Sequence, residues 1–478
     1  MAAAERGAPF GLLGRRLGHS WSPTIHAALG SAPYALFERE PGEVECFVRR
    51  GSWRGLNVTI PYKADAFRLA DEASPGARHL GAANTLVRRA DGSVFADNTD
   101  LAGFAWMLER FCRRRLGGCA REALAGRKAL VLGSGGASQA AQAVLAQAGA
   151  RVSVISRRGP DGYDTLARRH SDASLIVNTT PVGMYPHCPA SPVSEADLAR
   201  LESLRGVLDV VYNPTRTGIC LAAERLSIPF ESGLAMLVAQ ARFSSELFQG
   251  RPLDDGMIGG LEREILSSVT NVIYIGMPGS GKTTSGKALA RLLGRPFVDM
   301  DDAIGLELGI SAEEFIRTRG EAAFRAVETR MATRYGARSG LVIACGGGVV
   351  TRPENYDLLH QNGRIVLLDR PLSELSLRGR PLSQAKGVER IAHERQDLYH
   401  AWADVKLACT GSAAGDAART WASDEGRAGK RRVDTRSRCA LTRWPSRRMP
   451  RRLCGHLAPY NATRRTAAPA VREHAGVP

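Results

Sequence analysis

The 478-residue sequence lacks the features of a membrane-spanning or secreted protein. No apolar run approaches the roughly 18 residues that a membrane-spanning helix needs. The first 18 residues hold neither a sustained apolar stretch nor a convincing cleavage site, so we do not expect secretion. The nine cysteines are scattered, and Cys112 and Cys119 are too far apart for a zinc knuckle. We therefore expect reduced thiols in a cytoplasmic protein.

Positive charge is concentrated near the C-terminus. The formal net charge is +17, and the residues from 411 onward, with fifteen Lys and Arg against five Asp and Glu, supply +10 of it. The remaining +7 belongs to the body of the protein. A moderately basic body suits anionic small-molecule substrates, whereas a basic tail could also bind nucleic acid.

Short apolar runs alternate with helical patterns along most of the chain. The first series has strand-like runs at residues 129–132, 151–155, 175–178 and 207–211, and the second at 271–275, 296–300, 341–345 and 364–368. This alternation is typical of βαβ units, so we predict an α/β protein with parallel, doubly wound sheets. The length agrees with about three compact units.

Residues 276–283 fit the pattern G-x-x-x-x-G-K-[ST], directly after a predicted strand and before a helix. In such a phosphate-binding loop, or P-loop, backbone N–H groups and the helix N-terminus point at nucleotide phosphates. Lys282 would reach the outer phosphates, and the Thr283 hydroxyl would bind Mg²⁺. The residues expected to contact ATP are Pro278, Gly279, Ser280, Gly281, Lys282 and Thr283.

Polar motifs after the P-loop bear on which molecule could receive the phosphate. Asp299 and Asp301 lie at the end of the strand-like run 296–300, and their period-2 spacing predicts that both carboxylates point to the same side. Further motifs are G-E-A-A-F-R at 320–325, G-G-G at 346–348 and R-G-R-P-L at 378–382. Together these motifs resemble the shikimate kinase family over roughly residues 271–407.

That resemblance implies a role for each matching residue. Asp299 would help to hold Mg²⁺ through water, and Asp301 would bind the shikimate hydroxyls and act as the base. Two arginines would clamp the substrate carboxylate, which suits their planar donors. These two arginines are Arg325 and Arg395, and the backbone of Gly347 would also contact the substrate.

The R-G-R-P-L segment would form a lid over the nucleotide. By the resemblance, Arg378 would stack on adenine and Arg380 would close over the phosphates. The stretch between these arginines is shorter than the family pattern, and Asp397 stands where the family usually has proline.

A glycine-rich turn follows the strand-like run 129–132 and opens a helix. A turn in this context is typical of a dinucleotide site, where the pyrophosphate meets the helix N-terminus. Its residues are Gly133, Ser134, Gly135, Gly136 and Ala137, and the next strand ends at Ser156, Arg157 and Arg158. An NAD site would carry an acid at this strand end, so the two arginines favour the 2′-phosphate of NADP.

Several ordered motifs around this turn are individually weak. Before it come H-S-W-S-P at 19–23, N-V-T-I-P-Y-K at 57–63, G-A-A-N-T at 81–85 and N-T-D at 98–100. After it come N-T-T-P-V-G-M at 178–184, D-V-V-Y-N-P at 209–214 and the run 233–240. Together they resemble the shikimate dehydrogenase family over about residues 10–250.

The dehydrogenase resemblance implies a catalytic pair of Lys63 and Asp100. Lys63 would protonate the developing alkoxide while NADPH reduces the C3 carbonyl of 3-dehydroshikimate, and Asp100 would orient Lys63. The implied substrate contacts are Ser20 and Ser22 for the carboxylate, Thr59, Asn84 and Gln240 for hydroxyls, and Tyr212 packing nearby. Gly233 would contact the cofactor.

The two resemblances together predict a bifunctional enzyme of the shikimate pathway. The ketone reduced by the first half becomes the 3-hydroxyl that the second half phosphorylates. An alternative is that only one half is active, the other being regulatory or quinate-preferring. A basic nucleic-acid-binding ATPase is disfavoured by the complete dehydrogenase motif set.

We expect the following organisation along the chain. The predicted parts are a substrate-binding α/β domain (9–104), a Rossmann NADP domain (105–250), a linker (251–269), a P-loop kinase domain (270–408) and a basic tail (409–478). The tail has three interpretations: a disordered extension, an RNA-binding arm, or an out-of-frame translation that replaces the kinase's final helix. The composition shift after the helical start at 415–419 favours the last.

Overall fold

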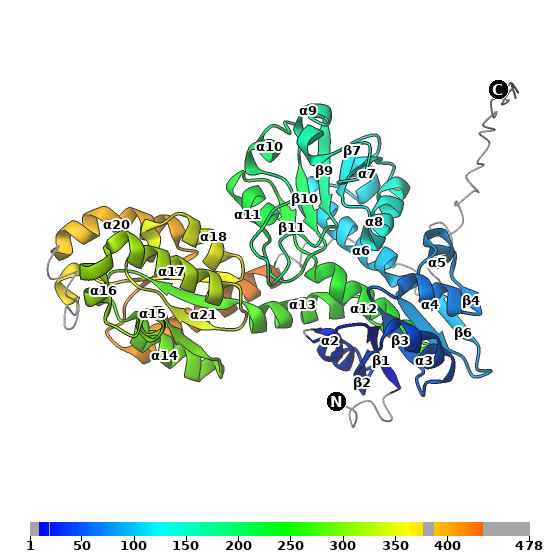
Figure 1. Ribbon diagram of the computed structural model, residues 1–478, viewed down its shortest axis with the longest axis horizontal. Coiled ribbons are helices and arrows are strands. Elements are labelled where there is room, and N and C mark those ends of the chain that lie inside the picture. Colours follow the sequence, from blue (N-terminus) through cyan, green and yellow to red (C-terminus); the bar gives the residue numbers. More distant parts are fainter. Residues whose placement is uncertain (1–8, 19, 376–386, 434–478) are drawn as a thin grey trace, which may run out of the picture. The chain divides into compact units, whose positions relative to one another are not determined.

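The computed structural model describes residues 9–18, 20–375 and 387–433, and three separate β-sheets organise them (Figure 1). The N-terminal sheet has the strand order β2-β1-β3-β5-β6-β4. The central sheet has the order β11-β10-β9-β7-β8, and the C-terminal sheet β13-β14-β12-β15-β16. The predicted α/β fold class is confirmed.

The N-terminal sheet is mixed. β1 pairs in parallel with β2 and β3, whereas β5 runs antiparallel to both β3 and β6. Its strands are β1 (Phe10–Gly14), β2 (Tyr34–Glu38), β3 (Gly55–Val58), β4 (Glu72–Ala73), β5 (Thr85–Arg88) and β6 (Val94–Asp97). Its helices are α2 (Ser22–Ala28), α3 (Val44–Arg50), α4 (Lys63–Leu69) and α5 (Pro75–Leu80).

The central sheet is parallel throughout. Its strands are β7 (Lys128–Leu132), β8 (Arg151–Ile155), β9 (Ala173–Asn178), β10 (Gly206–Asp209) and β11 (Phe230–Glu231). Its helices are α6 (Thr99–Phe111), α7 (Ala120–Leu124), α8 (Gly136–Gln147), α9 (Leu166–Arg169), α10 (Glu195–Ala199), α11 (Gly218–Arg225) and α12 (Leu234–Gln249). β9 and β10 are buried along their whole length, as expected of parallel strands covered by helices on both faces.

The segment predicted as a linker contains a helix with one buried face, α13 (Gly256–Val269). Ile258, Leu261 and Ile265 recur at helical spacing and pack in one cluster with Leu234 and Val238 of α12. The turn residues before residue 256 led to the linker prediction, although a short helix-like run follows them in the sequence. α13 therefore completes the core of the first module, which we take as residues 9–269.

The C-terminal sheet is also parallel and organises the second module, residues 271–433. Its strands are β12 (Asn271–Ile275), β13 (Phe297–Asp299), β14 (Val342–Ala344), β15 (Gly363–Asp369) and β16 (Val405–Ala408). Its helices are α14 (Lys282–Leu293), α15 (Met300–Leu308), α16 (Ala312–Arg319), α17 (Glu321–Gly336), α18 (Glu354–His360), α20 (Val388–Trp402) and α21 (Ala413–Val433).

Helix α21 lies beyond the boundary predicted at residue 408 and packs on α14. Asp416 is only 2% exposed, and its carboxylate accepts hydrogen bonds from Thr410 (N, 2.6 Å; Oγ1, 2.9 Å) and from Oγ of Ser285 in α14 (3.1 Å). Thr420 lies 2.8 Å from the hydroxyl of Tyr274 in β12. The second module thus includes the start of the segment predicted as tail, whereas residues 434–478 lie outside the described part.

Two candidate active sites

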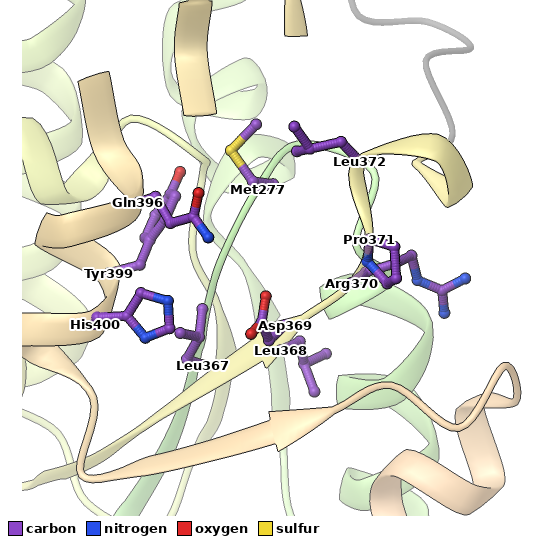
Figure 2. Close-up of a pocket in the computed structure, with 10 residues that line it drawn as sticks. All are labelled: Met277, Leu367, Leu368, Asp369, Arg370, Pro371, Leu372, Gln396, Tyr399 and His400. Atoms are coloured by element: carbon purple, nitrogen blue, oxygen red, sulfur yellow. The ribbon is translucent and has the colours of Figure 1, made fainter. Parts of the chain in front are cut away.

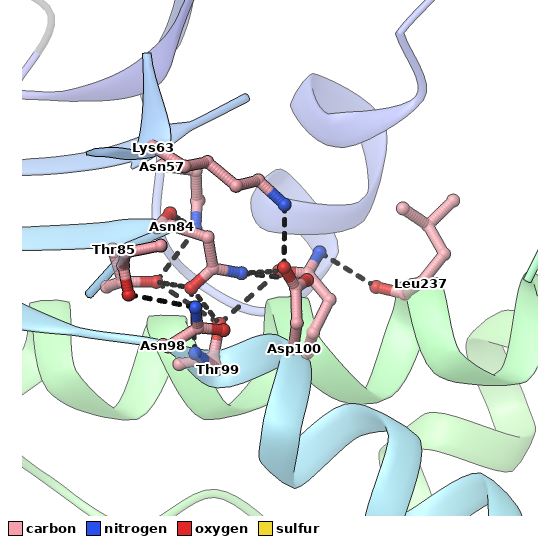
Figure 3. Close-up of polar contacts among 10 residues, drawn as sticks. Asn57, Lys63, Asn84, Thr85, Asn98, Thr99, Asp100 and Leu237 are labelled. Atoms are coloured by element: carbon pink, nitrogen blue, oxygen red, sulfur yellow. Dashed lines mark hydrogen bonds and ion pairs between the residues drawn. The ribbon is translucent and has the colours of Figure 1, made fainter. Parts of the chain in front are cut away.

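The predicted catalytic pair of the first module is in direct contact. Nζ of Lys63, the first residue of α4, lies 2.6 Å from Oδ2 of Asp100 in the first turn of α6 (Figure 3). The Lys63 side chain is 25% exposed and that of Asp100 14%, so solvent reaches the pair while its charges remain close. An ammonium held this way has a fixed direction and can donate a proton to a neighbouring oxygen.

Asn84, just before β5, fixes the other oxygen of Asp100. Its Nδ2 donates to Oδ1 of Asp100 at 2.9 Å and lies 3.5 Å from Oε1 of Gln240 in α12. Its Oδ1 accepts from the backbone N–H of Thr99 at 2.7 Å and from Oγ1 of Thr85 at 3.1 Å (Figure 3). The amide is therefore oriented from both ends, and four predicted site residues from separate elements meet: Lys63, Asn84, Asp100 and Gln240.

Thr99 is a site residue that the sequence reasoning missed. Its N–H and its Oγ1 (3.1 Å) both bond to Oδ1 of Asn84. The motif N-T-D held the signal, because small polar residues at the start of a helix commonly bond to neighbouring backbone and side-chain groups.

The predicted carboxylate-binding serines lie at the start of α2. The backbone N–H of Ser22 donates to Oγ of Ser20 at 3.2 Å. Trp21 between them packs on Tyr212, with ring centroids 5.3 Å apart, and burial raises the pKa of Tyr212. The backbone carbonyl oxygen of Thr59 accepts a hydrogen bond from the backbone N–H of Tyr62 at 2.9 Å, and this bond forms the turn that leads into Lys63.

The glycine-rich turn lies between β7 and α8. Gly133 has φ +100°, a conformation that favours glycine, and a Cβ there would lie 3.0 Å from Cγ2 of Thr180. Nothing lies within 4 Å of a Cβ built on Gly135 or Gly136, so a ligand can approach this backbone closely. At the end of the neighbouring strand β8, Ser156 is buried and Arg157 and Arg158 are exposed. This donor set fits a dinucleotide with an additional phosphate.

Two further motif residues, Gly233 and Asp209, are explained by their close contacts within the fold. Gly233 approaches Val210 so closely that a Cβ would lie 2.1 Å from the carbonyl oxygen, so its cofactor contact stays a prediction. Asp209 is buried at the end of β10 and accepts from Asn178 (Nδ2, 3.1 Å), Val211 (N, 2.9 Å) and Thr217 (Oγ1, 2.5 Å). Burial raises the pKa of Asp209 to about 6.

In the second module the P-loop connects β12 to α14. Gly279 and Gly281 have φ values of +88° and +98°, which glycine accommodates without strain. Nζ of Lys282 is 2.9 Å from both the Gly276 and the Met277 carbonyl oxygens. Oγ1 of Thr283 donates to Oδ2 of Asp299 at 2.6 Å. The hydroxyl and carboxylate predicted to serve Mg²⁺ are therefore adjacent, and oxygen donors of this kind fit that ion.

The predicted strand geometry of Asp299 and Asp301 is wrong. β13 ends at Asp299, which is the N-cap of α15, and its Oδ1 accepts from the N–H groups of Asp301 (3.0 Å) and Asp302 (3.4 Å). An aspartate satisfies the free N–H groups of a helix start, and this preference ends the strand before the period-2 alternation applies. Asp301 instead faces the site from the first turn of α15.

Three consecutive glycines bring the parts of the kinase site together. A Cβ on Gly346 would lie 2.5 Å from Oδ1 of Asp301, and one on Gly347 would lie 2.8 Å from Cγ of the P-loop residue Pro278. A Cβ on Gly348 would overlap the guanidinium of Arg325 at 1.9 Å. A side chain at any of these positions would displace a neighbour, and this backbone joins the phosphate loop to the predicted substrate residues.

The predicted carboxylate clamp rests on a buried acid that the sequence reasoning did not find. Arg325 pairs with Glu328 and, at 3.0 Å, with Glu321. Glu328 is 2% exposed, and burial raises its pKa even though Arg325 acts in the opposite direction. Its i+3 spacing from Arg325 on α17 was the available signal.

Arg395 reaches the same region from α20. Its Nη1 donates to the Gly347 carbonyl oxygen at 3.0 Å, and the Tyr399 hydroxyl donates to the same oxygen. Arg378 and Arg380, the predicted lid residues, lie outside the described residues.

A pocket of about 120 Å³ with a largely apolar lining lies beside the P-loop (Figure 2). Met277 of the loop forms part of its wall, and the end of β15 and helix α20 supply the remaining residues: Leu367, Leu368, Asp369, Arg370, Pro371, Leu372, Gln396, Tyr399 and His400. The resemblance assigned no role to Arg370, Gln396 or His400.

Neither module contains a recognisable preformed metal cluster: the described residues hold no group of three His, Cys, Asp or Glu side chains placed to bind a metal ion. None of the helices in the described ranges is long and apolar enough to cross a membrane.

Known protein families match both halves of the chain. Residues 12–86 match the model of the shikimate dehydrogenase substrate-binding domain, and residues 278–423 match that of shikimate kinase. The chain is 36% identical over 254 residues to the shikimate dehydrogenase (NADP(+)) of Methylobacterium radiotolerans, covering 48% of this chain and 87% of the relative. It is 38% identical over 269 residues to that of Caulobacter vibrioides, covering 50% and 89%. A solved shikimate dehydrogenase from Peptoclostridium difficile is 31% identical, with a TM-score of 0.47 and coverage of 54% of this chain and 97% of the other.

The folds and sites define a Rossmann-type dehydrogenase followed by a P-loop kinase. The chain belongs to the shikimate dehydrogenase family through its first module and carries a shikimate kinase domain in its second. It is a bifunctional enzyme of the shikimate pathway, as the sequence predicted.

Proposed function

We propose that Lys63 and Asp100 catalyse the NADPH-dependent reduction of 3-dehydroshikimate, and that the second module transfers the γ-phosphate of ATP to the resulting 3-hydroxyl. The observation that carries the first step is the Lys63–Asp100 pair with Asn84 bonded behind it. The P-loop joined by Gly346–Gly348 to Asp301 and Arg325 carries the second.

In the reduction, NADPH when bound supplies a hydride to the C3 carbonyl carbon. Lys63 donates a proton from Nζ to the carbonyl oxygen as negative charge develops there, which yields the hydroxyl group. Asp100 holds the ammonium in place and stabilises its charge before transfer, and Asn84 keeps Asp100 in position. Arg157 and Arg158 would select the 2′-phosphorylated cofactor.

In the phosphoryl transfer, Asp301 accepts the proton of the 3-hydroxyl as its oxygen attacks the γ-phosphorus and ADP leaves. Lys282 turns from the Gly276 and Met277 carbonyls to the outer phosphates. Thr283 and Asp299 would hold Mg²⁺, which would supply charge neutralisation at the phosphates. Arg325 and Arg395 would clamp the shikimate carboxylate. We place this enzyme in the cytoplasm, with small-molecule substrates and no nucleic-acid partner.

The test uses the full chain and three proteins: the natural sequence, Lys63→Ala and Lys282→Ala. Given 3-dehydroshikimate, NADPH, ATP and Mg²⁺, the natural chain should form shikimate 3-phosphate. Lys63→Ala should reduce NADPH oxidation at least 100-fold, in line with the loss of a positioned acid, and should still phosphorylate added shikimate. Lys282→Ala should accumulate shikimate.

Each outcome bears on one module. Formation of shikimate 3-phosphate by Lys282→Ala at the natural rate would contradict the kinase assignment. NADPH oxidation unaffected by Lys63→Ala would remove Lys63 from the catalytic pair. Mass spectrometry of the products distinguishes shikimate from shikimate 3-phosphate directly.

A further inference from the structure

A second cation lies at the P-loop, and no motif of the sequence points to it. Arg370 follows β15 by one residue, and its Nη2 is 3.9 Å from a Cβ built on Gly281. The same point is 3.5 Å from Oγ1 of Thr284. Arg370 therefore reaches the side of the P-loop where α14 begins.

The Arg370 side chain is directed toward the loop and away from the neighbouring pocket. Figure 2 shows its guanidinium extending away from Tyr399 and His400. Its Nε is buried and has no hydrogen-bond partner among the described residues. The guanidinium also lies within hydrogen-bonding reach of the Cys409 thiol, where it opposes the rise in the Cys409 pKa that burial causes. A buried donor without an acceptor is costly, so a partner for it is expected.

The two cations of the loop occupy different ends. Lys282 is directed at the carbonyls of Gly276 and Met277, at the start of the loop, from which it would reach the outer phosphates. Arg370 lies beside Gly281 and Thr284, where loop and helix N–H groups would cradle the inner phosphates. A guanidinium suits this position because its planar donors match two phosphate oxygens at once.

We propose that Arg370 binds the α- and β-phosphate edge of the nucleotide and so contributes to its affinity. The inference rests on the proposed kinase function of this module and adds a residue to its nucleotide site. Arg370 is a binding residue here, and the γ-phosphate being transferred remains with Lys282.

The experiment compares Arg370→Ala, Arg370→Gln and Arg370→Lys in the full chain. Isothermal titration calorimetry measures the affinity of each variant for ADP, AMP and adenosine. Comparing the three affinities shows which part of the nucleotide Arg370 contacts. We expect Arg370→Ala to weaken ADP and AMP binding about tenfold, the effect of losing one charge-assisted hydrogen bond to phosphate, and to leave adenosine binding unchanged. The KM for ATP should rise by a similar factor, while kcat and the KM for shikimate change less than about twofold. Arg370→Lys should recover part of the loss.

Arg330→Ala is the matched control, because Arg330 pairs with Glu307 on the exposed surface of the same module. It should leave all these values unchanged. Arg370→Gln keeps much of the side-chain stem and serves if Arg370→Ala folds poorly, as judged by its thermal transition.

Unchanged ADP and AMP affinity in Arg370→Gln would overturn the proposal. An equal loss for adenosine would also overturn it, because the contact would then be to the nucleoside. Failure of the natural chain to phosphorylate shikimate would count against the kinase function alone, since Arg370-dependent ADP binding is measured without shikimate.

Discussion

Asn84 determines how the two oxygens of Asp100 are used, since one accepts from Asn84 and the other pairs with Lys63. Asn84→Asp keeps the shape but places a carboxylate oxygen against Oδ1 of Asp100. Two neighbouring carboxylates resist double ionisation, so the pair should retain a proton to higher pH. We expect kcat for the reduction to fall on the order of tenfold at pH 8, a barrier change of about 1.4 kcal/mol.

The pH profile of reduction by Asn84→Asp checks this expectation. Part of the lost activity should return as the pH is lowered and the pair binds its shared proton. Kinase activity in the same preparation is the internal control. A uniform loss at every pH would show that only the shape or packing at residue 84 matters.

Asp209 should make stability depend on pH with the opposite sign to most carboxylates. Burial raises its pKa from 3.8 to about 6. Between these two pH values the folded state therefore holds a proton on Asp209 that the unfolded state has lost. Its stabilising contribution is complete below about pH 4 and is lost as the pH rises through about 6. Asp209→Asn should flatten this part of the profile, measured by chemical unfolding at pH 4.5 and 7.

Asp172→Asn provides a comparison. Lys128 lowers the pKa of Asp172 through a hydrogen bond, so its contribution is present above pH 4 and lost as the pH falls. The two variants should therefore change the pH dependence of the free energy of unfolding in opposite directions and in different ranges: Asp209→Asn between pH 4.5 and 7, and Asp172→Asn below about pH 4. A profile of Asp209→Asn identical to the natural one would contradict the raised pKa.

At the scale of elements, the predicted strands of the central and C-terminal sheets could be found because short, largely apolar runs bounded by turn residues are typical of buried strands. β8 and β12 coincide with the predicted runs 151–155 and 271–275. The element starts were harder to predict, because a single side chain decides them: Asp299 caps α15 and shortens β13. Contacts such as Asn84 to Gln240 join residues 156 positions apart, and the family resemblance brought both to attention where local patterns could not.

Helix α21 should be required by the kinase module. A chain ending at Thr410 loses the buried side chains of Asp416, Ala417 and Thr420, and it exposes the face of α14 that they cover. We expect such a chain to lose kinase activity and to lower the unfolding temperature of that module. A chain ending at Val433 should retain both, and dehydrogenase activity should persist in each. Full kinase activity in the shorter chain would show that α21 is dispensable.

At the scale of the whole molecule, the order of the modules follows the order of the chemistry. Each module carries its own sheet core and its own site, so their motifs could be identified independently in the sequence. The assignment of function depended on local patterns, such as the P-loop and the lysine that follows β3. The acids that support those patterns, Glu328 among them, became evident only when the helices were placed.

The glycine run 346–348 restricts how this kinase can be altered. A Cβ at any of the three positions would lie less than 3 Å from the P-loop residue Pro278, the carboxylate of Asp301 or the guanidinium of Arg325, so a larger residue there must displace a neighbour. A protein engineer who wishes to admit a bulkier alcohol must therefore leave this wall alone. Exposed residues of α16, such as Glu313 and Arg317, are not among the atoms nearest to these glycines and can change size without displacing them.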